Sequence, residues 1–230
     1  MRAVLLAAGY GTRLRPITNT IPKCLVPIKG QPLLDIWLGN LTKAGIGPFL
    51  VNTHYLAEQV EAYIRSSPYQ DRVSLVHEPE LRGTAGTLIA NLGFFCGEDG
   101  MLIHADNYCL PDFRAFVRAH QGRPAECLMT MMTFRTDDPS SCGIVELDGR
   151  CIVTGFYEKV AAPPGNLANG AVDIVSAEML KILGKDLHRV KDFSTEVLGR
   201  FVGQIFSCET GAKFVDIGTP AAYEMTNRAH

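Results

Sequence analysis

The residues of this chain best suited to chemistry lie in one stretch near its start. Gly9, Gly11, Thr12 and Arg13 follow an apolar run, and a second cation, Lys23, comes ten residues after Arg13. Glycines let backbone N–H groups approach a ligand closely, and successive N–H groups form an anion-binding nest. Arginine and lysine beside such a nest indicate phosphate. The stretch therefore predicts a nucleoside triphosphate site.

Two other phosphate-binding loops fit this stretch poorly. The dinucleotide fingerprint needs a third glycine opening a helix, but Leu14 takes that position, and Pro16 and Pro22 oppose a helix there. The Walker loop ends in Gly-Lys-Ser/Thr, which the stretch lacks. The remaining alternative is an ordinary strand and turn that carries surface cations.

Two aspartates follow segments that the sequence predicts to be strands. Asp106 ends the apolar segment 101–106, and Asp216 follows segment 213–215. A carboxylate beside a polyphosphate is repelled unless a hard cation lies between them, and Mg²⁺ takes one or two protein carboxylates together with phosphate oxygens. Asp216 lies outside the helix start formed by Thr219 and Pro220, so capping does not explain it.

Strands that alternate with helices must position these residues. Apolar side chains recur at helical spacing from Leu33 to Leu41, which predicts a helix over 33–44 between strands. The alternation favours an α/β fold with a parallel, doubly wound sheet, whose ligands lie beyond the carboxyl ends of the strands. The other predicted elements are strands 49–53, 73–76, 125–134 and 167–175, helices 56–64, 85–95, 112–121 and 221–228, a hairpin over 141–159 with an Asp-Gly turn, and a closing hairpin of 204–206 and 213–215.

Composition excludes several classes of protein. The net charge is −2 without a long basic run, so we expect no nucleic-acid partner. No apolar run reaches about 18 residues, so we expect no membrane span. The chain enters a strand at once, without a signal peptide, and its seven cysteines lie scattered in apolar segments. These features predict reduced thiols in a cytoplasmic protein.

The whole pattern Gly-x-Gly-Thr-Arg-Leu-x-Pro-x-Thr, followed by Pro22-Lys23, resembles the sugar-1-phosphate nucleotidyltransferases. The segments Gly83-Thr84-Ala85-Gly86 and Asp216-Ile217-Gly218-Thr219-Pro220 resemble further motifs of that family. The resemblance implies a Rossmann-like three-layer sandwich with a mixed, mainly parallel sheet. It also implies one domain over 1–230, with a nucleotide-binding half (1–135), a sugar-phosphate-binding half (136–218) and a C-terminal helix (219–230).

The resemblance also implies roles for individual residues. Arg13 would contact the pyrophosphate, Lys23 the α-phosphate, and Asp106, the third catalytic residue, would hold Mg²⁺ together with Asp216. Ala105 stands where the family usually has the glycine before the metal aspartate. The remaining nucleotide-binding candidates are Leu6, Ala8, Gly9, Gly11, Thr12, Glu78, Gly83 and Thr84, and the sugar-phosphate candidates are Gly143, Glu158, Lys159 and Asn169.

The implied reaction joins a nucleoside triphosphate to a sugar 1-phosphate, giving an NDP-sugar and pyrophosphate, a precursor of cell-surface polysaccharide. The form of the motifs favours GTP with a mannose- or heptose-type sugar 1-phosphate. Uridylyl or cytidylyl transfer to another sugar 1-phosphate or to a phosphorylated alcohol is the enzymatic alternative. A non-catalytic regulatory protein that binds sugar nucleotides is the alternative of another class, and assembly into a homo-oligomer is left open.

Overall fold

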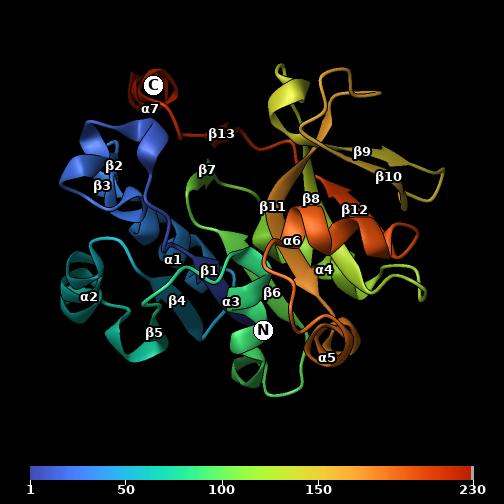
Figure 1. Ribbon diagram of the computed structural model, residues 1–230, viewed down its shortest axis with the longest axis horizontal. Coiled ribbons are helices and arrows are strands. Elements are labelled where there is room, and N and C mark those ends of the chain that lie inside the picture. Colours follow the sequence, from blue (N-terminus) through green and yellow to red (C-terminus); the bar gives the residue numbers. More distant parts are fainter. Residues whose placement is uncertain (229–230) are drawn as a thin grey trace. The chain divides into compact units, whose positions relative to one another are not determined.

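The computed structural model describes residues 1–228, and the chain divides into two compact units. Unit 1 contains residues 1–81 and 103–110 and the C-terminal segment from Lys213, and unit 2 contains residues 82–102 and 111–212 (Figure 1). No helix among the described residues is both long and apolar enough to cross a membrane.

A parallel sheet forms the core of unit 1. Strand β4 (Phe49–Thr53) lies between β1 (Arg2–Leu6) and β5 (Val73–His77), and both pairings are parallel. Helix α1 (Leu33–Lys43) buries the predicted apolar stripe completely, and helix α2 (Ala57–Ser66) precedes β5. Residues of β1 and β4 are buried along nearly their whole length, as expected for parallel strands covered on both faces.

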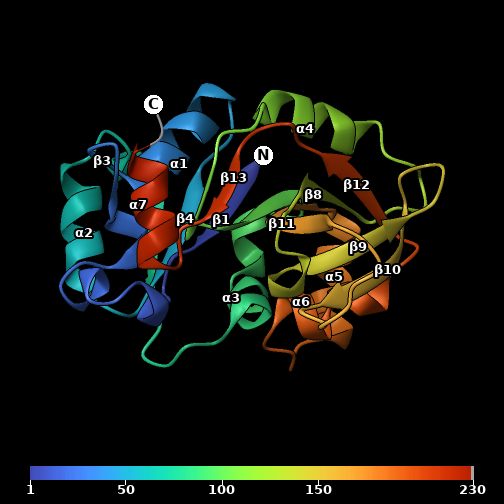
Figure 2. The ribbon, with the colours of Figure 1, turned by 90° about the horizontal axis from the view of Figure 1, so that it is seen from above.

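The remaining elements of unit 1 include two small antiparallel ribbons. Strands β2 (Pro27–Ile28) and β3 (Gln31–Pro32) form one, and β7 (Asn107–Cys109) and β13 (Phe214–Asp216) form the other. Helix α7 (Pro220–Arg228) lies beside the first ribbon (Figure 2), where the Tyr223 hydroxyl donates to the Pro27 carbonyl. The predicted C-terminal helix is confirmed through Arg228, whereas Ala229 and His230 lie outside the described residues.

Unit 2 is built on a mixed sheet. Strand β8 (Met129–Arg135) pairs in parallel with β12 (Ile205–Glu209) and antiparallel with β11 (Leu167–Val175), which also pairs antiparallel with β9 (Gly143–Leu147). Figure 2 shows α4 (Phe113–Gln121) on one face of this sheet and α5 (Ala177–Asp186) and α6 (Phe193–Glu196) on the other. The remaining elements are β10 (Val153–Glu158), α3 (Thr84–Ala90) and β6 (Gly100–His104), which runs from unit 2 into unit 1.

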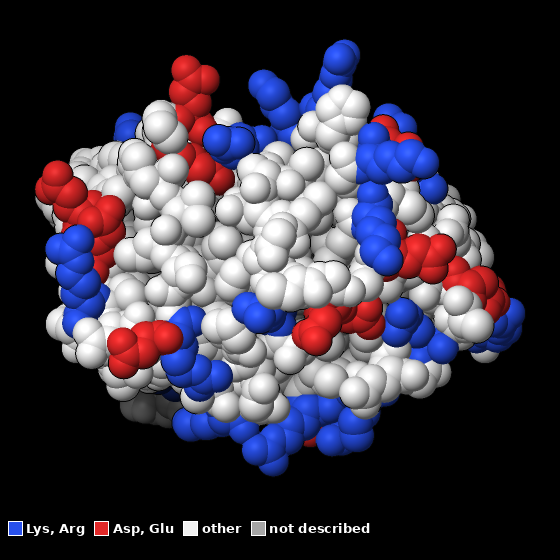
Figure 3. All heavy atoms as spheres, turned by 90° about the horizontal axis from the view of Figure 1, so that it is seen from below, with Lys and Arg blue, Asp and Glu red and all other residues white. Residues whose placement is uncertain are grey.

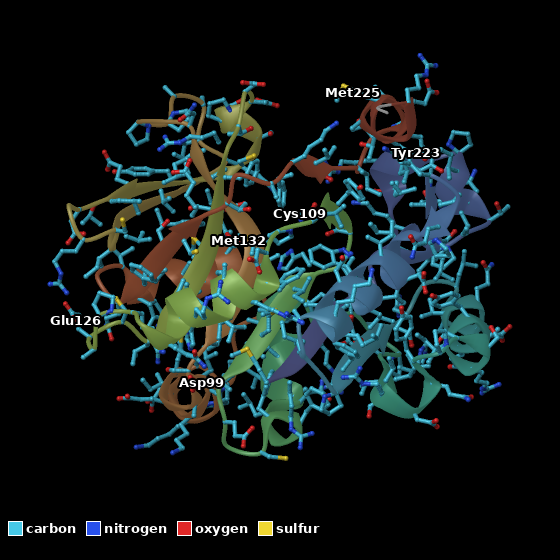
Figure 4. All side chains as sticks on the ribbon, turned by 180° about the vertical axis from the view of Figure 1, so that it is seen from behind. Asp99, Cys109, Glu126, Met132, Tyr223 and Met225 are labelled. Carbon is cyan, nitrogen blue, oxygen red and sulfur yellow. The ribbon has the colours of Figure 1, made fainter. Side chains whose placement is uncertain are left out.

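Polar pairs and sulfur side chains both contribute to the interior of unit 2. The methionines of β8, including Met132 in Figure 4, are buried core side chains. Buried His120 of α4 lies 2.8 Å from the Thr130 hydroxyl and 3.1 Å from Asp99, which also accepts the Ala177 amide at the start of α5. This network ties α4, β8 and α5 together.

Several predicted elements are confirmed and one is wrong. The hairpin of β9 and β10 is confirmed, with Asp148 accepting the turn amides of Arg150 and Ile152. The closing hairpin of 204–206 and 213–215 is wrong, because β12 pairs with β8 and β13 with β7. Boundaries also differ: β8 begins at Met129, and the helix predicted over 85–95 ends at Ala90 before a 3-10 turn.

Candidate active site

The glycine-rich loop of unit 1 presents a row of backbone N–H groups. Within the described chain, the amides of residues 9–13 donate to no protein acceptor. Gly11 has a φ of 62°, and a Cβ there would lie 2.9 Å from a methyl carbon of Thr18, so only glycine fits. The Thr18 hydroxyl donates to the Gly11 carbonyl at 2.7 Å and fixes the loop. Free, fixed amides of this kind form an anion-binding nest.

The other predicted residues of this loop lie around the nest. Leu6, the last residue of β1, accepts the Ala105 amide through its carbonyl, and Ala8 is buried. Gly9 and Thr12 are exposed, and Thr12 opens a 3-10 helix that ends at Leu14. Three of the five residues that carry the unpaired amides, Gly9, Gly11 and Thr12, therefore have small side chains, whereas Tyr10 and Arg13 have large ones.

Four charged side chains of unit 1 meet in a group that we call the cation–carboxylate cluster: Arg13, Lys23, Asp106 and Asp216. The Lys23 ammonium lies 2.9 Å from Asp106 Oδ2 and 3.5 Å from Asp216 Oδ1. The Arg13 guanidinium lies 3.1 Å from Asp216 Oδ2. Lys23 is buried, with its side chain 7% exposed, whereas both carboxylates are nearly half exposed. The structure thus brings together the predicted catalytic and metal residues of unit 1.

The ribbon of β7 and β13 explains how two distant aspartates meet. Asp216 pairs with Asn107, the residue that follows Asp106. Gly218 donates its amide to Asp216 Oδ1 at 2.8 Å, and a Cβ on Gly218 would lie 2.7 Å from both Asp216 and Arg13. A side chain at this glycine of the Asp-x-Gly-Thr-Pro motif would therefore displace the Arg13–Asp216 ion pair.

The electrostatics of the cluster keep Asp106 ionised. Burial pushes the pKa of Asp106 up, but the charge of Lys23 and its hydrogen bond, with a contribution from His104, outweigh burial and lower the pKa below its usual value. Ala105 is fully buried and its backbone does not have a positive φ, so alanine is accommodated where the family usually has glycine.

The cluster fits a divalent cation that prefers oxygen ligands. One ammonium nitrogen already contacts an oxygen of each carboxylate, so both oxygens face a position that a positive charge can occupy. The described residues contain no group of three or more His, Cys, Asp and Glu side chains that could hold a metal. Two carboxylates without further protein ligands suit Mg²⁺, which usually keeps waters and substrate phosphates.

Glu78 is buried directly after β5 and hydrogen-bonds to a neighbouring strand. Asn52 of β4 donates its amide group to Glu78 Oε1 at 3.2 Å, while its own oxygen accepts the Ala7 amide at 2.8 Å. Both side chains are at most 4% exposed. Asn52 therefore links the end of β1 to Glu78. Sequence reasoning missed Asn52, although a polar residue inside the apolar strand 49–53 was a usable signal.

A second link missed by sequence reasoning joins the glycine-rich loop to Glu78. His54 Nδ1 lies 2.6 Å from the Glu78 carbonyl, which can only accept, so Nδ1 carries the hydrogen. The other nitrogen of a neutral His54 then accepts from the Tyr10 hydroxyl at 2.9 Å. Tyr10 is 45% exposed and also packs edge-on against the His54 ring.

Gly83 and Thr84, the other nucleotide-binding candidates, lie at the start of α3 in unit 2. The Thr84 hydroxyl accepts the Phe193 amide at 2.7 Å, and the amides of Ala85 and Gly86 both donate to the Lys191 carbonyl. Gly83 has a φ of 79°, and a Cβ there would lie 2.4 Å from that same carbonyl. These contacts show how the turn is held, and its nucleoside-binding role stays a prediction.

The four sugar-phosphate candidates lie on neighbouring strands of unit 2. Gly143 of β9 pairs with Glu158 of β10, and the pairing of Ala168 with Ile144 places Asn169 of β11 next to Gly143 on the other side. Gly143 has no side chain, and a Cβ there would lie 2.6 Å from Glu158 Oε2. Glu158 and Asn169 therefore lie on the strands on either side of Gly143, which places no side chain between them.

Two contacts orient the polar groups of these four residues, Gly143, Glu158, Lys159 and Asn169, which we call the acceptor row. The Asn169 side-chain oxygen accepts the Ala171 amide at 2.8 Å, which leaves its NH₂ group to donate. The exposed Lys159 ammonium lies 3.5 Å from Glu158 Oε1. The row thus offers an acceptor, a donor and an exposed positive charge, a combination suited to a phosphorylated polyol.

Comparison with known proteins agrees with this geometry. A family model described as "Nucleotidyl transferase" matches residues 2–230. The mannose-1-phosphate guanylyltransferase catalytic subunit beta of Danio rerio is 30% identical over 225 residues, which cover 96% of this chain and 62% of that protein. The chain thus spans about three fifths of the length of these curated relatives.

Solved structures show the same architecture. HddC from Yersinia pseudotuberculosis, crystallised in complex with GMP-PN, has a TM-score of 0.81 and 26% identity, with 98% of this chain and 97% of that chain covered. A chain from Bacillus anthracis reaches a TM-score of 0.87 at 18% identity, covering 99% of this chain and 94% of that chain, which shows the fold alone. The predicted α/β fold with a mixed, mainly parallel sheet is confirmed.

Proposed function

Because the chain belongs to the nucleotidyl transferase family, we propose that it transfers a nucleotidyl group from a nucleoside triphosphate to a sugar 1-phosphate. The family resemblance predicted from the sequence is confirmed. The observation that carries the proposed activity is the cation–carboxylate cluster beside five unpaired amides, because this combination suits a polyphosphate and a divalent cation.

The proposed reaction is a displacement at phosphorus. An oxygen of the sugar phosphate attacks the α-phosphorus, a new P–O bond forms, and the bond to the bridging oxygen of the leaving pyrophosphate breaks. The attacking oxygen is already ionised at neutral pH, so no general base is needed. The main obstacle is the repulsion of two anions, which is ~1 kcal/mol for unit charges 4 Å apart in water and several-fold larger in a drier site.

The positive side chains of the chain offset this repulsion. Arg13 binds the departing pyrophosphate, Lys23 binds the α-phosphate, and the amides of residues 9–13 bind phosphate oxygens. Asp106 and Asp216 would hold Mg²⁺, which supplies charge neutralisation on the phosphates when it is bound. Fixed positive groups aimed at developing negative charge stabilise the transition state most when they need no rearrangement during the reaction.

Glu78 favours guanine as the base. Glu78 is one of the nucleotide-binding candidates, and a carboxylate accepts hydrogen bonds only. The edge of guanine presents an adjacent ring N–H and amino group, two donors that match one carboxylate. Adenine and cytosine present a bare ring nitrogen there, and uracil flanks its single N–H with carbonyls. The names of the relatives, a guanylyltransferase and a protein complexed with GMP-PN, agree with GTP.

The acceptor row of unit 2 binds the sugar 1-phosphate, which is the acceptor of the reaction. Glu158 accepts from sugar hydroxyls, Asn169 donates to a hydroxyl oxygen, and Lys159 binds the sugar phosphate. The sugar 1-phosphate is of the mannose or heptose type, as the form of the motifs predicts. The product is a nucleotide-activated sugar for cell-surface polysaccharide, made in the cytoplasm, where nucleoside triphosphates are available. Uridylyl or cytidylyl transfer remains the enzymatic alternative.

The proposal is tested by pyrophosphate release with Mg²⁺. Five triphosphates (GTP, UTP, CTP, dTTP and ATP) are each combined with a panel of sugar 1-phosphates that includes mannose and heptose forms. We expect release with GTP and a mannose- or heptose-type acceptor. Release with UTP or CTP would overturn the base assignment. Binding of GTP without release from any acceptor would favour the non-catalytic regulatory alternative.

A further inference from the structure

The cation–carboxylate cluster is internally neutralised in the free chain. Lys23 contacts both aspartates and Arg13 contacts Asp216, so two positive charges face two negative charges. Lys23 is held most firmly, because its side chain is only 7% exposed and its ammonium lies 2.9 Å from Asp106. A cation this well paired does not point freely toward an incoming ligand.

The proposed function requires the same atoms to have different partners. The α-phosphate needs the Lys23 ammonium, whereas the divalent cation needs the two carboxylates that this ammonium contacts. A divalent cation entering alone would lie beside the Lys23 ammonium, and the two positive charges would repel each other even in water. A triphosphate entering alone would draw Lys23 away and leave two carboxylates beside its own negative charge.

We propose that the cluster is an exchange site, in which Lys23 occupies the metal carboxylates until a triphosphate and a divalent cation replace it together. This inference rests on the proposed function. Lys23 and Arg13 move from carboxylate to phosphate oxygens, and Asp106 and Asp216 pass from ammonium to metal. Every charge keeps a partner of opposite sign throughout the exchange, and neither ligand alone achieves that.

The exchange makes the two ligands bind cooperatively. Coupling of two binding sites is reciprocal, and its usual size is about 5- to 150-fold in affinity. The free chain should therefore bind a divalent cation weakly, although it carries two suitably placed carboxylates. Removing the ammonium should strengthen metal binding, whereas loss of an ordinary metal ligand would weaken it.

The test is titration of the chain with Mn²⁺ alone, followed by electron paramagnetic resonance. Lys23→Met removes the ammonium, and Lys29→Met serves as the matched control, because Lys29 is an exposed lysine of the same unit. We expect Lys23→Met to bind one Mn²⁺ at least 10-fold more tightly than the wild type, and Lys29→Met to match the wild type. Equal affinity in all three proteins would overturn the exchange.

A double variant tests whether the gained Mn²⁺ affinity depends on Asp106. Adding Asp106→Asn to Lys23→Met should abolish the gained affinity, and a gain that persists would place the metal elsewhere and contradict the proposal. Circular dichroism checks that each variant is folded, and Lys23→Gln replaces Lys23→Met if the latter is unfolded.

Calorimetry of GTP binding to the wild type tests the exchange without any substitution. GTP should bind at least 10-fold more weakly in EDTA than with Mg²⁺, and equal affinities would contradict the exchange. If GTP fails to bind even with Mg²⁺ while Lys23→Met still gains Mn²⁺ affinity, the proposed nucleotide is wrong and the competition of Lys23 with metal stands.

Discussion

At the scale of single residues, Lys23 and Asp106 carry the proposed chemistry. Asp106 is 43% exposed at its side chain, so water can solvate the carboxylate when Lys23 is removed, and Asp216 still pairs with the buried Lys23 ammonium when Asp106 is removed. We therefore expect Lys23→Ala and Asp106→Ala to lower kcat/KM by two orders of magnitude or more while the chain stays folded. Steady-state pyrophosphate release measures the first, and Lys29→Ala is the control. Full activity in either variant would refute the assigned roles.

Asp173 is a second residue with a measurable consequence. It is 1% exposed on β11, its Oδ1 has no hydrogen-bond partner within residues 1–228, and burial raises its pKa to about 8. The Asp173 carboxyl has a pKa of ~4 in the unfolded chain. Between the unfolded pKa and the folded pKa, the folded state therefore holds a proton that the unfolded state has lost. Stability should therefore fall as pH rises through this window, by at most ~1.4 kcal/mol per pH unit.

Asp173→Asn should remove that pH dependence. Relative to the wild type, the variant should gain stability between pH 5 and pH 8, and the gain should level off above pH 8. Urea unfolding at pH 5 and pH 8.5 measures the difference, with Asp137→Asn as an exposed control. A difference between variant and wild type that does not change with pH would show that Asp173 is not buried as a neutral acid.

The predictability of single residues depended on their motifs. Arg13, Lys23, Asp106 and Asp216 could be chosen from the sequence, because each stands in a recognisable motif, and the two aspartates also lie at the ends of strands. The pairing of Lys23 with both carboxylates could not, since it depends on distances between residues far apart in the chain. The role of Asn52 could not be predicted for a related reason, because its hydrogen-bond partners come from two other segments of the chain.

At the scale of elements, the hairpin of β9 and β10 offers a test of the acceptor row. A Cβ at Gly143 would lie 2.6 Å from Glu158 Oε2 and 2.8 Å from the Phe156 ring, so Gly143→Ala should displace Glu158. We expect the KM for the sugar 1-phosphate to rise by about 10-fold or more while the KM for GTP stays unchanged. Gly149→Ala is the matched control, because a Cβ at this turn residue of the same hairpin meets nothing within 4 Å.

An unchanged KM for the sugar phosphate in Gly143→Ala would remove this row from the acceptor site. A rise in the KM for GTP of the same size would indicate a general loss of structure, which Gly149→Ala and a thermal unfolding curve would reveal.

Elements with strong periodicity or a specific turn were predictable. The stripe of α1 and the Asp-Gly turn of the β9–β10 hairpin are local signals, so the sequence sufficed. The closing hairpin was predicted wrongly because β12 and β13 are separated by a short polar link that resembles a hairpin loop. The hydrogen bonds of β12 are instead made with β8, some 70 residues earlier, a pairing without a local signal.

At the scale of the whole molecule, the two units carry different parts of the proposed reaction. Unit 1 contains the glycine-rich loop and the cation–carboxylate cluster, and unit 2 contains the acceptor row. Basic and acidic side chains are interspersed around a broad uncharged region on the face in Figure 3. Fold class and family could be predicted because the motifs occur in the expected order along the chain, whereas the division at residues 81, 103, 111 and 213 follows from tertiary contacts.

The proposed direct transfer between two bound substrates predicts a sequential kinetic mechanism. The acceptor phosphate is itself the nucleophile, so GTP and Mg²⁺ without acceptor should release no burst of pyrophosphate. Initial rates measured over both substrate concentrations should give intersecting lines in a double-reciprocal plot. Parallel lines, or a stoichiometric burst with GTP alone, would reveal a covalent nucleotidyl intermediate and contradict direct transfer.

The central claim is that the nucleotidyl group passes to a sugar phosphate at the cluster of Arg13, Lys23, Asp106 and Asp216. The most direct measurement is phosphorus NMR of GTP and mannose 1-phosphate, and of GTP and a heptose 1-phosphate, incubated with the wild type and with Lys23→Ala in Mg²⁺. The account predicts pyrophosphate and a new diphosphate diester in equal amounts with one of these acceptors, and neither product with Lys23→Ala. Inorganic phosphate as the only product, no product with either acceptor, or undiminished transfer by Lys23→Ala would contradict it.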